Sequence, residues 1–265
     1  MSPIVSRVLV ALAALPVVLG LLWLGGWWIW SLAVAAALVA LHELWGMTRP
    51  LRPLVLAGYA GTLAALLGEQ LGGLEWMLGG FLTTFALAFL LKGVADTKGS
   101  TTVALGVTAL GVGWIGLGVG HLLLLRDIAP EDDGRLAAFT VLLSVWAADT
   151  AAYFVGRLIG RHKLAPTISP GKTWEGFFAG AAAAVLVSFF ALYEQGFLEG
   201  WRALVLGAVV AVAAALGDLF ESALKRDMDV KDTGRLLGGH GGMLDRLDSL
   251  LFAGVAAYYA ILALG

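Results

Sequence analysis

The chain alternates long apolar runs with short polar segments. An α-helix needs roughly 20 residues to cross about 30 Å of hydrocarbon. Nine runs reach or approach that length, at about 8–24, 28–45, 54–68, 74–91, 102–125, 136–156, 174–193, 203–221 and 248–264. We therefore predict an all-α polytopic membrane protein with about nine transmembrane helices. The third run is short and the break at 68–73 is weak, so eight spans is the alternative.

No soluble domain interrupts this pattern, and residues 1–265 are predicted to form a single integral membrane domain. Residues 1–135 would supply packing helices, and 136–265 would supply the helices that carry the polar loops 157–173 and 222–248. Composition agrees, with 60% hydrophobic and 14% charged residues. The absence of cysteine excludes disulfides and Cys-ligated metal sites. Arg7 before an apolar run also fits a signal peptide, but this run leads straight into a second one and is predicted to be the first span.

The basic residues are distributed unevenly between the polar segments. With nine spans, fourteen of the 17 Lys and Arg residues fall on one side, and only Arg126, Arg135 and Arg202 fall on the other. Cytoplasmic segments carry the excess of Lys and Arg. The N-terminus and the loops 157–173 and 222–247 are therefore expected in the cytoplasm and the C-terminus outside, as in a multi-pass protein of a bacterial inner membrane.

Glycines are frequent in the fifth and seventh spans, where small residues let helices approach closely. We predict packing surfaces there rather than ligand sites, and such faces also permit a homodimer. The glycines concerned are Gly106, Gly111, Gly113, Gly116, Gly118, Gly120, Gly176 and Gly180.

Two pairs of acids flank the most polar stretch of the chain. Asp218 and Glu221 are three residues apart near the end of the eighth span, so both lie on one helix face. Asp245 and Asp248 repeat that spacing where the ninth span begins. Oxygen ligands without His or Cys suit a hard cation such as Mg²⁺. The alternative is that these acids only cap and solvate helix ends, although Asp218 lies at or inside the membrane interface.

Between the acid pairs, the chain supplies cations and a glycine-rich turn. Lys225, Arg226, Lys231 and Arg235 precede the run Gly238–Gly242, which contains His240. Glycine-rich turns expose N–H groups that bind anions, which favours a phosphate ligand. The alternative is a topology determinant that rests on anionic lipid headgroups.

A second polar loop reads SPGKTWEG from residue 169 to 176. GKT suggests a P-loop, but that motif needs glycine where this chain has Pro166, and we expect no strand before it. Ser169 and Lys172 remain candidate phosphate ligands. Asp149 lies among apolar residues and is expected to face the bundle interior or a polar cavity. Glu43 is a weaker candidate, since capping or snorkelling explains it at least as well, and His121 and His162 are assigned no role.

The two polar loops together resemble the phosphatidate cytidylyltransferase family, also called CDP-diacylglycerol synthase. The family signature runs Ser-x-apolar-Lys-Arg, then Lys-Asp and a small residue, then His-Gly-Gly-apolar-x-Asp-Arg-apolar-Asp. The resemblance continues through Asp149–Tyr153, SPGKTWEG and GDLFES and covers roughly the C-terminal half; Gly238 departs from a proline common in the family. The signature positions are Ser222, Lys225, Arg226, Lys231, Asp232, Gly234, His240, Gly241, Gly242, Asp245, Arg246 and Asp248.

The resemblance implies a nucleotidyltransferase of phospholipid biosynthesis. It would transfer CMP from CTP to phosphatidic acid at the bilayer, giving CDP-diacylglycerol and pyrophosphate, with Mg²⁺ and a second, monovalent cation such as K⁺. The implied metal ligands are Asp218 and Asp245, supported by Glu221 and Asp248. Phosphate charge would be neutralised by Lys225, Arg226, Lys231 and Arg246. Substrate contacts would come from Ser169, Lys172, Ser222, Asp232, His240, Gly241, Gly242 and Asp149, with the loop that binds each substrate left open.

Three other classes explain parts of the pattern. A cation or lipid transporter would use Asp149 and Asp218 as an ion pathway, but it predicts internal symmetry that the sequence lacks. A lipid-binding scaffold explains the basic face but not the acid pairs. A CDP-alcohol phosphotransferase needs an Asp-rich helix motif that is absent. The sequence therefore favours the cytidylyltransferase.

Overall fold

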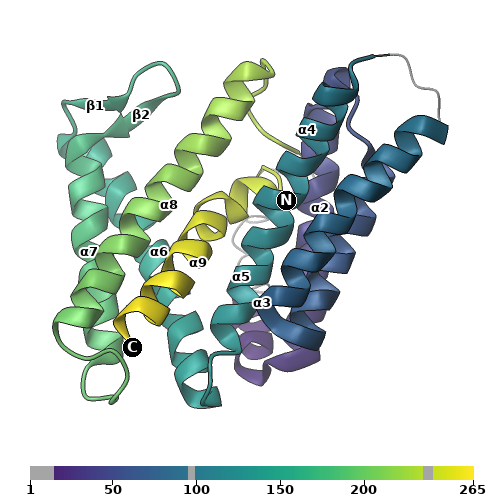
Figure 1. Ribbon diagram of the computed structural model, residues 1–265. Coiled ribbons are helices and arrows are strands. Elements are labelled where there is room, and N and C mark those ends of the chain that lie inside the picture. Colours follow the sequence, from purple (N-terminus) through teal and green to yellow (C-terminus); the bar gives the residue numbers. More distant parts are fainter. Residues whose placement is uncertain (1–14, 95–98, 235–240) are drawn as a thin grey trace. The chain divides into compact units, whose positions relative to one another are not determined.

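The computed structural model describes residues 15–94, 99–234 and 241–265, and it is mainly helical (Figure 1). In these residues, seven helices are long and apolar enough to cross a membrane, which agrees with the prediction of a polytopic α-helical membrane protein. A shorter apolar helix covers Leu15–Leu24. The long helices are α2 (Gly26–Met47), α3 (Val55–Val94), α4 to α5 (Thr101–Gly111 and Leu117–Arg126, joined by the π-helical turn η2, Val112–Gly116), α6 (Glu131–Ile159), α7 (Trp174–Leu192), α8 (Trp201–Asp227) and α9 (Leu244–Leu264).

Helix α3 doubles back on itself, and this explains why its length covers two predicted spans. Its backbone leaves the helical conformation at Gly72 and at Gly73, which has φ 68°. Gly68 packs on the backbone of Trp76, and Gly80 packs on the backbone of Ala64. The arms 55–71 and 74–94 are therefore antiparallel, about 25 and 31 Å long at 1.5 Å per residue. The weak sequence break at 68–73 is a real turn.

The chain divides into two compact units, and each is described by itself. Unit 1 contains the described residues up to Leu124 together with those of Val230–Arg246. Unit 2 contains Leu125–Asp229 and Leu247–Gly265. The C-terminal signature segment is thus shared, and its middle part belongs with the N-terminal helices.

Unit 1 is held together by large side chains set against small ones. The indole of Trp45 lies against Gly58 and Gly111, and the sulfur of Met77 lies against Gly120. Trp45 and Met77 are both buried. The prediction that glycines of the fifth span form packing surfaces is confirmed for these two, Gly111 and Gly120.

In unit 2, α6, α7 and α8 pack as antiparallel neighbours (Figure 1). Gly176 and Gly180 bring α7 against the backbone of α6 at Ala152 and Ala148, as their spacing predicted. Gly207 brings α8 equally close to α7. A side chain at any of these positions would separate the helices, because the atoms it would meet are mostly backbone.

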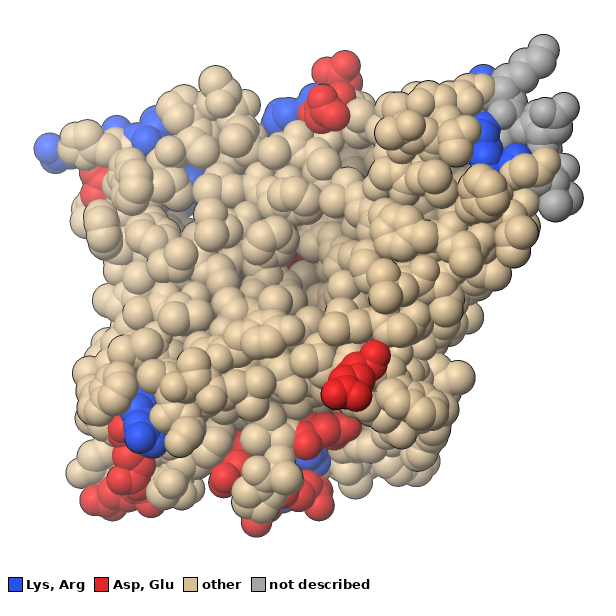
Figure 2. All heavy atoms as spheres, in the orientation of Figure 1, with Lys and Arg blue, Asp and Glu red and all other residues tan. Residues whose placement is uncertain are grey.

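Charge is distributed unevenly along unit 2. Figure 2 shows mainly acidic side chains at the end where α6 begins, whereas Lys and Arg side chains lie at the end that carries the β-hairpin, together with some acidic ones. Glu131, Asp132 and Asp133 form the first turn of α6, and Lys225 and Arg226 form the last turn of α8. Asp227 lies in the same last turn, so this end also carries acids, and the sidedness of the chain stays a prediction.

The loop after α6 contains the only departure from an all-α fold in the part of the chain that the structure describes. Strands β1 (Lys163–Ala165) and β2 (Ser169–Thr173) pair antiparallel. SPGKT forms β2, and Thr173 ends it as the N-cap of α7, accepting a hydrogen bond from the Gly176 N–H at 3.2 Å. GKT therefore lies in a strand and does not form a P-loop, but the expectation that no strand precedes it was wrong, because β1 does.

The α3 hairpin predicts unequal effects at two adjacent glycines. A Cβ at Gly80 would collide with the backbone of Ala64, whereas a Cβ at Gly79 meets nothing within 4 Å. Gly80→Ala should destabilise the protein by about 1–3 kcal/mol through overpacking. Gly79→Ala should be neutral or stabilise it by up to about 1 kcal/mol, because alanine favours helix. Thermal unfolding of both variants in one detergent checks this, and equal melting temperatures would contradict the hairpin.

Candidate active site

A cavity of about 670 Å³ lies within unit 2 between α6, α7, α8 and the β-hairpin. It brings together four residues that the sequence predicted as site residues and that are far apart in the chain. Asp149 comes from α6, Ser169 and Lys172 from β2, and Asp218 from α8. Arg157 and Lys163 add positive charge, and the rest of the lining is mainly small and apolar, including Ala148, Ala152, Gly156, Gly176, Gly180, Ala181, Ala211, Ala214 and Ala215.

Two of these residues contact each other directly. The Lys172 Nζ lies 2.6 Å from Oδ2 of Asp218, and both side chains are partly exposed to the cavity. The Ser222 hydroxyl lies one helical turn further on and donates to Oδ1 of Asp218 at 3.4 Å. Lys172, which was predicted to bind phosphate, thus supplies the positive charge that balances Asp218, which was predicted to bind metal. An incoming cation or phosphate would compete for one partner of this pair.

Further acids of unit 2 lie close to Asp218. Asp149 and Asp248 are near enough to interact electrostatically with Asp218 and with each other. Asp248 is buried, and its Oδ1 accepts the Ser249 N–H at 2.6 Å. Three carboxylates, from α6, α8 and α9, therefore lie within electrostatic range of one another.

Glu221 forms a buried ion pair with Lys225. It is 1% exposed, and its Oε2 lies 2.8 Å from Nζ of Lys225, whose side chain is 12% exposed. Glu221 also lies in hydrogen-bonding reach of Asp248. Because a buried carboxylate without a countercharge is costly, Lys225 has a structural reason to be where it is, besides the predicted contact with phosphate.

Besides the Lys172–Asp218 ion pair, further polar contacts join the region of the β-hairpin to the helices. Arg226 Nε donates to the Ile168 carbonyl oxygen at 3.3 Å, which joins the hairpin turn to the end of α8. His162 Nδ1 lies 2.6 Å from Oε1 of Glu175 in the first turn of α7. Arg226 thus positions the segment that carries Ser169 and Lys172, and His162, to which the sequence assigned nothing, anchors its base.

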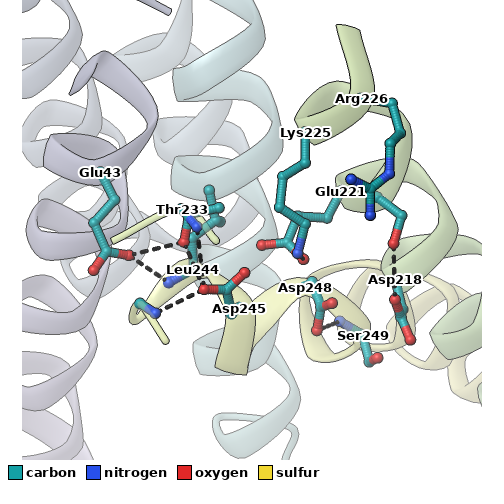
Figure 3. Close-up of polar contacts among 12 residues, drawn as sticks. Glu43, Asp218, Glu221, Lys225, Arg226, Thr233, Leu244, Asp245, Asp248 and Ser249 are labelled. Atoms are coloured by element: carbon teal, nitrogen blue, oxygen red, sulfur yellow. Dashed lines mark hydrogen bonds and ion pairs between the residues drawn. The ribbon is translucent and has the colours of Figure 1, made fainter. Parts of the chain in front are cut away.

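Unit 1 contains a second polar cluster, built around the carboxylates of Asp245 and Glu43 (Figure 3). Oδ2 of Asp245 accepts hydrogen bonds from the Gly242 N–H at 2.7 Å, the Thr233 hydroxyl at 3.0 Å and the Thr233 N–H at 3.3 Å. Oε2 of Glu43 accepts the Leu244 N–H at 2.9 Å. Asp245 therefore shapes the turn that precedes α9 with one of its two oxygens.

The other signature residues lie around this second cluster. Lys231, Asp232 and Arg246 are exposed, and Gly241 has φ 80°, a left-handed conformation that favours glycine. His240 lies outside the described residues. Asp245 belongs to unit 1, whereas Asp218, Glu221 and Asp248 belong to unit 2. The predicted joint metal site of Asp218 and Asp245 therefore stays a prediction.

The donor chemistry of unit 2 fits a hard divalent cation. Its acids offer only oxygen ligands, and the Lys172 ammonium already lies on one of them, Asp218. In residues 15–94, 99–234 and 241–265, no three His, Asp or Glu side chains are arranged as a ready metal cage. Mg²⁺ does not need one, because it is often held by one or two carboxylates and completes its shell with water and substrate phosphates.

Sequence reasoning missed two kinds of residue. Glu43 was only a weaker candidate, for which capping or snorkelling was at least as good an explanation, yet it is 7% exposed and hydrogen-bonded to the signature segment. The sequence did contain a signal for Glu43, because it is an acid inside an apolar run, and the same observation made Asp149 a candidate. Arg157 and Lys163 were treated only as topology determinants, since nothing in their spacing shows that the end of α6 and strand β1 line the same cavity.

Comparison with known proteins gives consistent matches over nearly the whole chain. The cytidylyltransferase family matches residues 5–264. The chain is 35% identical over 253 residues to a phosphatidate cytidylyltransferase of Staphylococcus haemolyticus, covering 93% of this chain and 94% of that protein. It is 36% identical over 270 residues to a phosphatidate cytidylyltransferase of Brucella suis, covering 97% and 93%. A Mycobacterium bovis protein of the same name is 34% identical over 254 residues, covering 88% and 80%.

The chain therefore belongs to the cytidylyltransferase family. The match extends well beyond the C-terminal half that carries the recognisable motifs, so the N-terminal helices are part of the shared fold. These matches give no support to the transporter alternative.

The buried pair of Glu221 and Lys225 predicts a large and specific loss of stability. Lys225→Met keeps most of the side chain's bulk but leaves Glu221 without its cation, which should cost about 3–5 kcal/mol. Arg226→Met is the matched control, because the adjacent Arg226 is exposed and donates one hydrogen bond to a carbonyl oxygen, worth about 1.5–3 kcal/mol at most. Thermal unfolding should therefore show the larger fall in Tm for Lys225→Met. Equal falls would contradict the structural role of the pair.

Proposed function

We propose that the chain is a phosphatidate cytidylyltransferase, a nucleotidyltransferase of phospholipid biosynthesis. It transfers CMP from CTP to phosphatidic acid and gives CDP-diacylglycerol and pyrophosphate. Family membership over residues 5–264 and the common name of the relatives support this. The signature positions are all kept in the sequence, from Ser222 to Asp248.

The observation that carries the proposal is the mixed lining of the unit 2 cavity. It combines the cations Arg157, Lys163 and Lys172, the Ser169 hydroxyl and the acids Asp149 and Asp218 with alanines and glycines of the long apolar helices. A phospholipid needs both environments, because its phosphate seeks cations and its glycerol and acyl chains seek apolar walls. We therefore assign phosphatidate to this cavity and the CTP triphosphate to the cations Lys225, Arg226, Lys231 and Arg246.

The reaction is a direct displacement. A phosphate oxygen of phosphatidate attacks the α-phosphorus of CTP; the new P–O bond forms as the bond to the bridging α–β oxygen breaks, and pyrophosphate leaves. The attacking oxygen is already anionic, so no strong general base and no covalent enzyme intermediate are needed. The protein has to bring two polyanions together, which makes positioning and charge neutralisation the main sources of rate enhancement. Lys172 and Ser169 position the attacking phosphate in this scheme.

Mg²⁺ is the proposed cofactor, held by Asp218 with Asp248 and Glu221 close by. The proximity of carboxylates in unit 2 supports this assignment, and Asp245 is proposed as a further ligand. When bound, Mg²⁺ would neutralise the charge of the triphosphate. Asp149 would remain a neighbour of the lipid phosphate and of the other acids. A monovalent cation such as K⁺ stays a secondary expectation.

The full topology is also part of the proposal. Counting the two arms of α3 separately and the first apolar run as a span gives nine transmembrane segments. The N-terminus, the β-hairpin and the signature segment would then face the cytoplasm of a bacterial inner membrane. The uneven charge distribution within unit 2 supports this orientation. Homodimerisation through glycine-rich faces remains a prediction.

The proposed activity predicts a product that can be isolated. Purified protein in detergent should convert α-³²P-labelled CTP and phosphatidic acid into a labelled lipid in the presence of Mg²⁺. Adding EDTA should abolish the reaction, because the two substrates repel each other without the cation. Thin-layer chromatography detects the lipid and a coupled assay detects pyrophosphate.

Asp218→Asn is the variant that tests the metal site. It should lose at least 10²-fold in turnover and need more Mg²⁺ for half-maximal rate, in line with the effects of about 10–100-fold known for supporting groups alone. Labelled lipid no greater than in a protein-free control would refute the activity. Normal Mg²⁺ dependence in Asp218→Asn would refute the metal assignment but leave the activity intact.

The lipid cavity predicts a selective change in KM. Ala181 lines the cavity, whereas Ala182 is exposed on the other side of α7. Ala181→Leu should raise the KM for phosphatidic acid on the order of tenfold, since the larger side chain takes up acyl or glycerol space. The KM for CTP should not change, and Ala182→Leu should behave like the wild type. A rise in the KM for CTP alone would reverse the assignment of substrates.

A further inference from the structure

Glu43 is a buried carboxylate for which the proposed reaction has no use. It lies near the end of α2, in unit 1, and is 7% exposed within an otherwise apolar helix. An acid in such a position is costly unless donors surround it. Oε2 accepts the Leu244 N–H at 2.9 Å, and within the described residues Oε1 is buried without a hydrogen-bond partner. The contact crosses 201 positions of the chain.

Leu244 is the first residue of α9, so its N–H is one of the four that an α-helix leaves unpaired at its N-terminus. The Glu43 carboxylate satisfies this N–H from another helix. It also places negative charge at the positive end of the α9 dipole, where an anion is stabilising. Glu43 thus caps the first residue of α9 from outside the segment, and that cap sets where the helix begins.

The backbone on both sides of residues 235–240 is packed on the same carboxylate. A Cβ added to Gly234 or Gly242 would collide with the Glu43 side chain. These two glycines therefore let the main chain approach Glu43 closely. The signature requires small residues here for a reason that lies in the N-terminal half of the protein.

Thr233 connects Glu43 to Asp245 (Figure 3). Its hydroxyl lies 3.0 Å from Oδ2 of Asp245 and 3.4 Å from Oε2 of Glu43. A hydroxyl has a single proton to donate, and the shorter distance assigns it to Asp245. Thr233 is therefore wedged between the two carboxylates, and displacement of Glu43 would move the groups that orient Asp245.

We propose that Glu43 is a positioning residue for nucleotidyl transfer, which fixes from α2 the start of α9 and thereby the orientation of Asp245 and Arg246. Glu43 does not touch substrate and acts through the Leu244 N–H and Thr233. The inference rests on the proposed function. It also assigns a task to the N-terminal helices beyond packing.

The test compares two buried glutamates of unit 1. Glu43→Met removes the acceptor but keeps the length of the side chain, and Glu43→Gln keeps one acceptor oxygen. Glu69→Met is the matched control, because Glu69 is also buried but lies on α3 on the order of 20 Å along the helix from its first residue. We expect Glu43→Met to lower kcat per folded enzyme by roughly 10–100-fold. Glu43→Gln should recover most of that loss, and Glu69→Met should leave kcat unchanged.

A double variant at Glu43 and Thr233 distinguishes a positioning role of Glu43 from a general structural one. Thr233→Val should lower kcat, and the double variant with Glu43→Met should be no slower than the slower single variant, because both act on Asp245. The proposal would be overturned if the losses in kcat of the two single variants multiplied in the double variant. Equal losses in kcat for Glu43→Met and Glu69→Met would overturn it too. If Glu43→Met does not fold, Glu43→Asp decides: its shorter side chain withdraws the acceptor, and wild-type kcat would refute the role. An inactive wild type would refute the proposed function instead.

Discussion

Buried and partly buried carboxylates in an apolar helical bundle are the constraint on which the polar structure of this protein depends. Each must have a cation or N–H groups beside it, since the surrounding helices offer neither water nor spare donors. Glu221 has Lys225, Asp218 has Lys172, and Glu43 has the start of α9. These requirements fix the β-hairpin to α8 in one unit and the signature segment to α2 in the other.

Small residues let the helices and the main chain come close enough for these charged contacts to form. Gly176 and Gly180 bring α7 onto α6 and leave the alanine-lined cavity beside them, while Gly234 and Gly242 let the main chain reach Glu43. The glycines therefore act in two ways. Some form contact surfaces between membrane helices, and others let the main chain pack directly on a carboxylate. A family signature that fixes both acids and glycines reflects one geometric requirement.

The sequence predicted the helices well because a membrane span must be long and apolar, and that property is local. It also identified Asp149, Ser169, Lys172 and Asp218, and the structure places all four around one cavity. It could not identify the hairpin, since SPGKT has no alternating pattern, or the capping of α9 by Glu43, since 201 positions separate the partners. The chemical character of a short segment could be predicted from the sequence, whereas contacts between distant segments depend on how the helices pack.

The bond between Glu43 and Leu244 also has a consequence for how the protein is made. At about 5–20 residues per second, a ribosome needs about 10–40 s to reach Leu244 after it has added Glu43. During that time α2 enters the bilayer with an acid whose final donor does not yet exist. The first unit therefore reaches its native state only after nearly the whole chain has been synthesised, and a truncated product would carry an unsatisfied acid into the membrane.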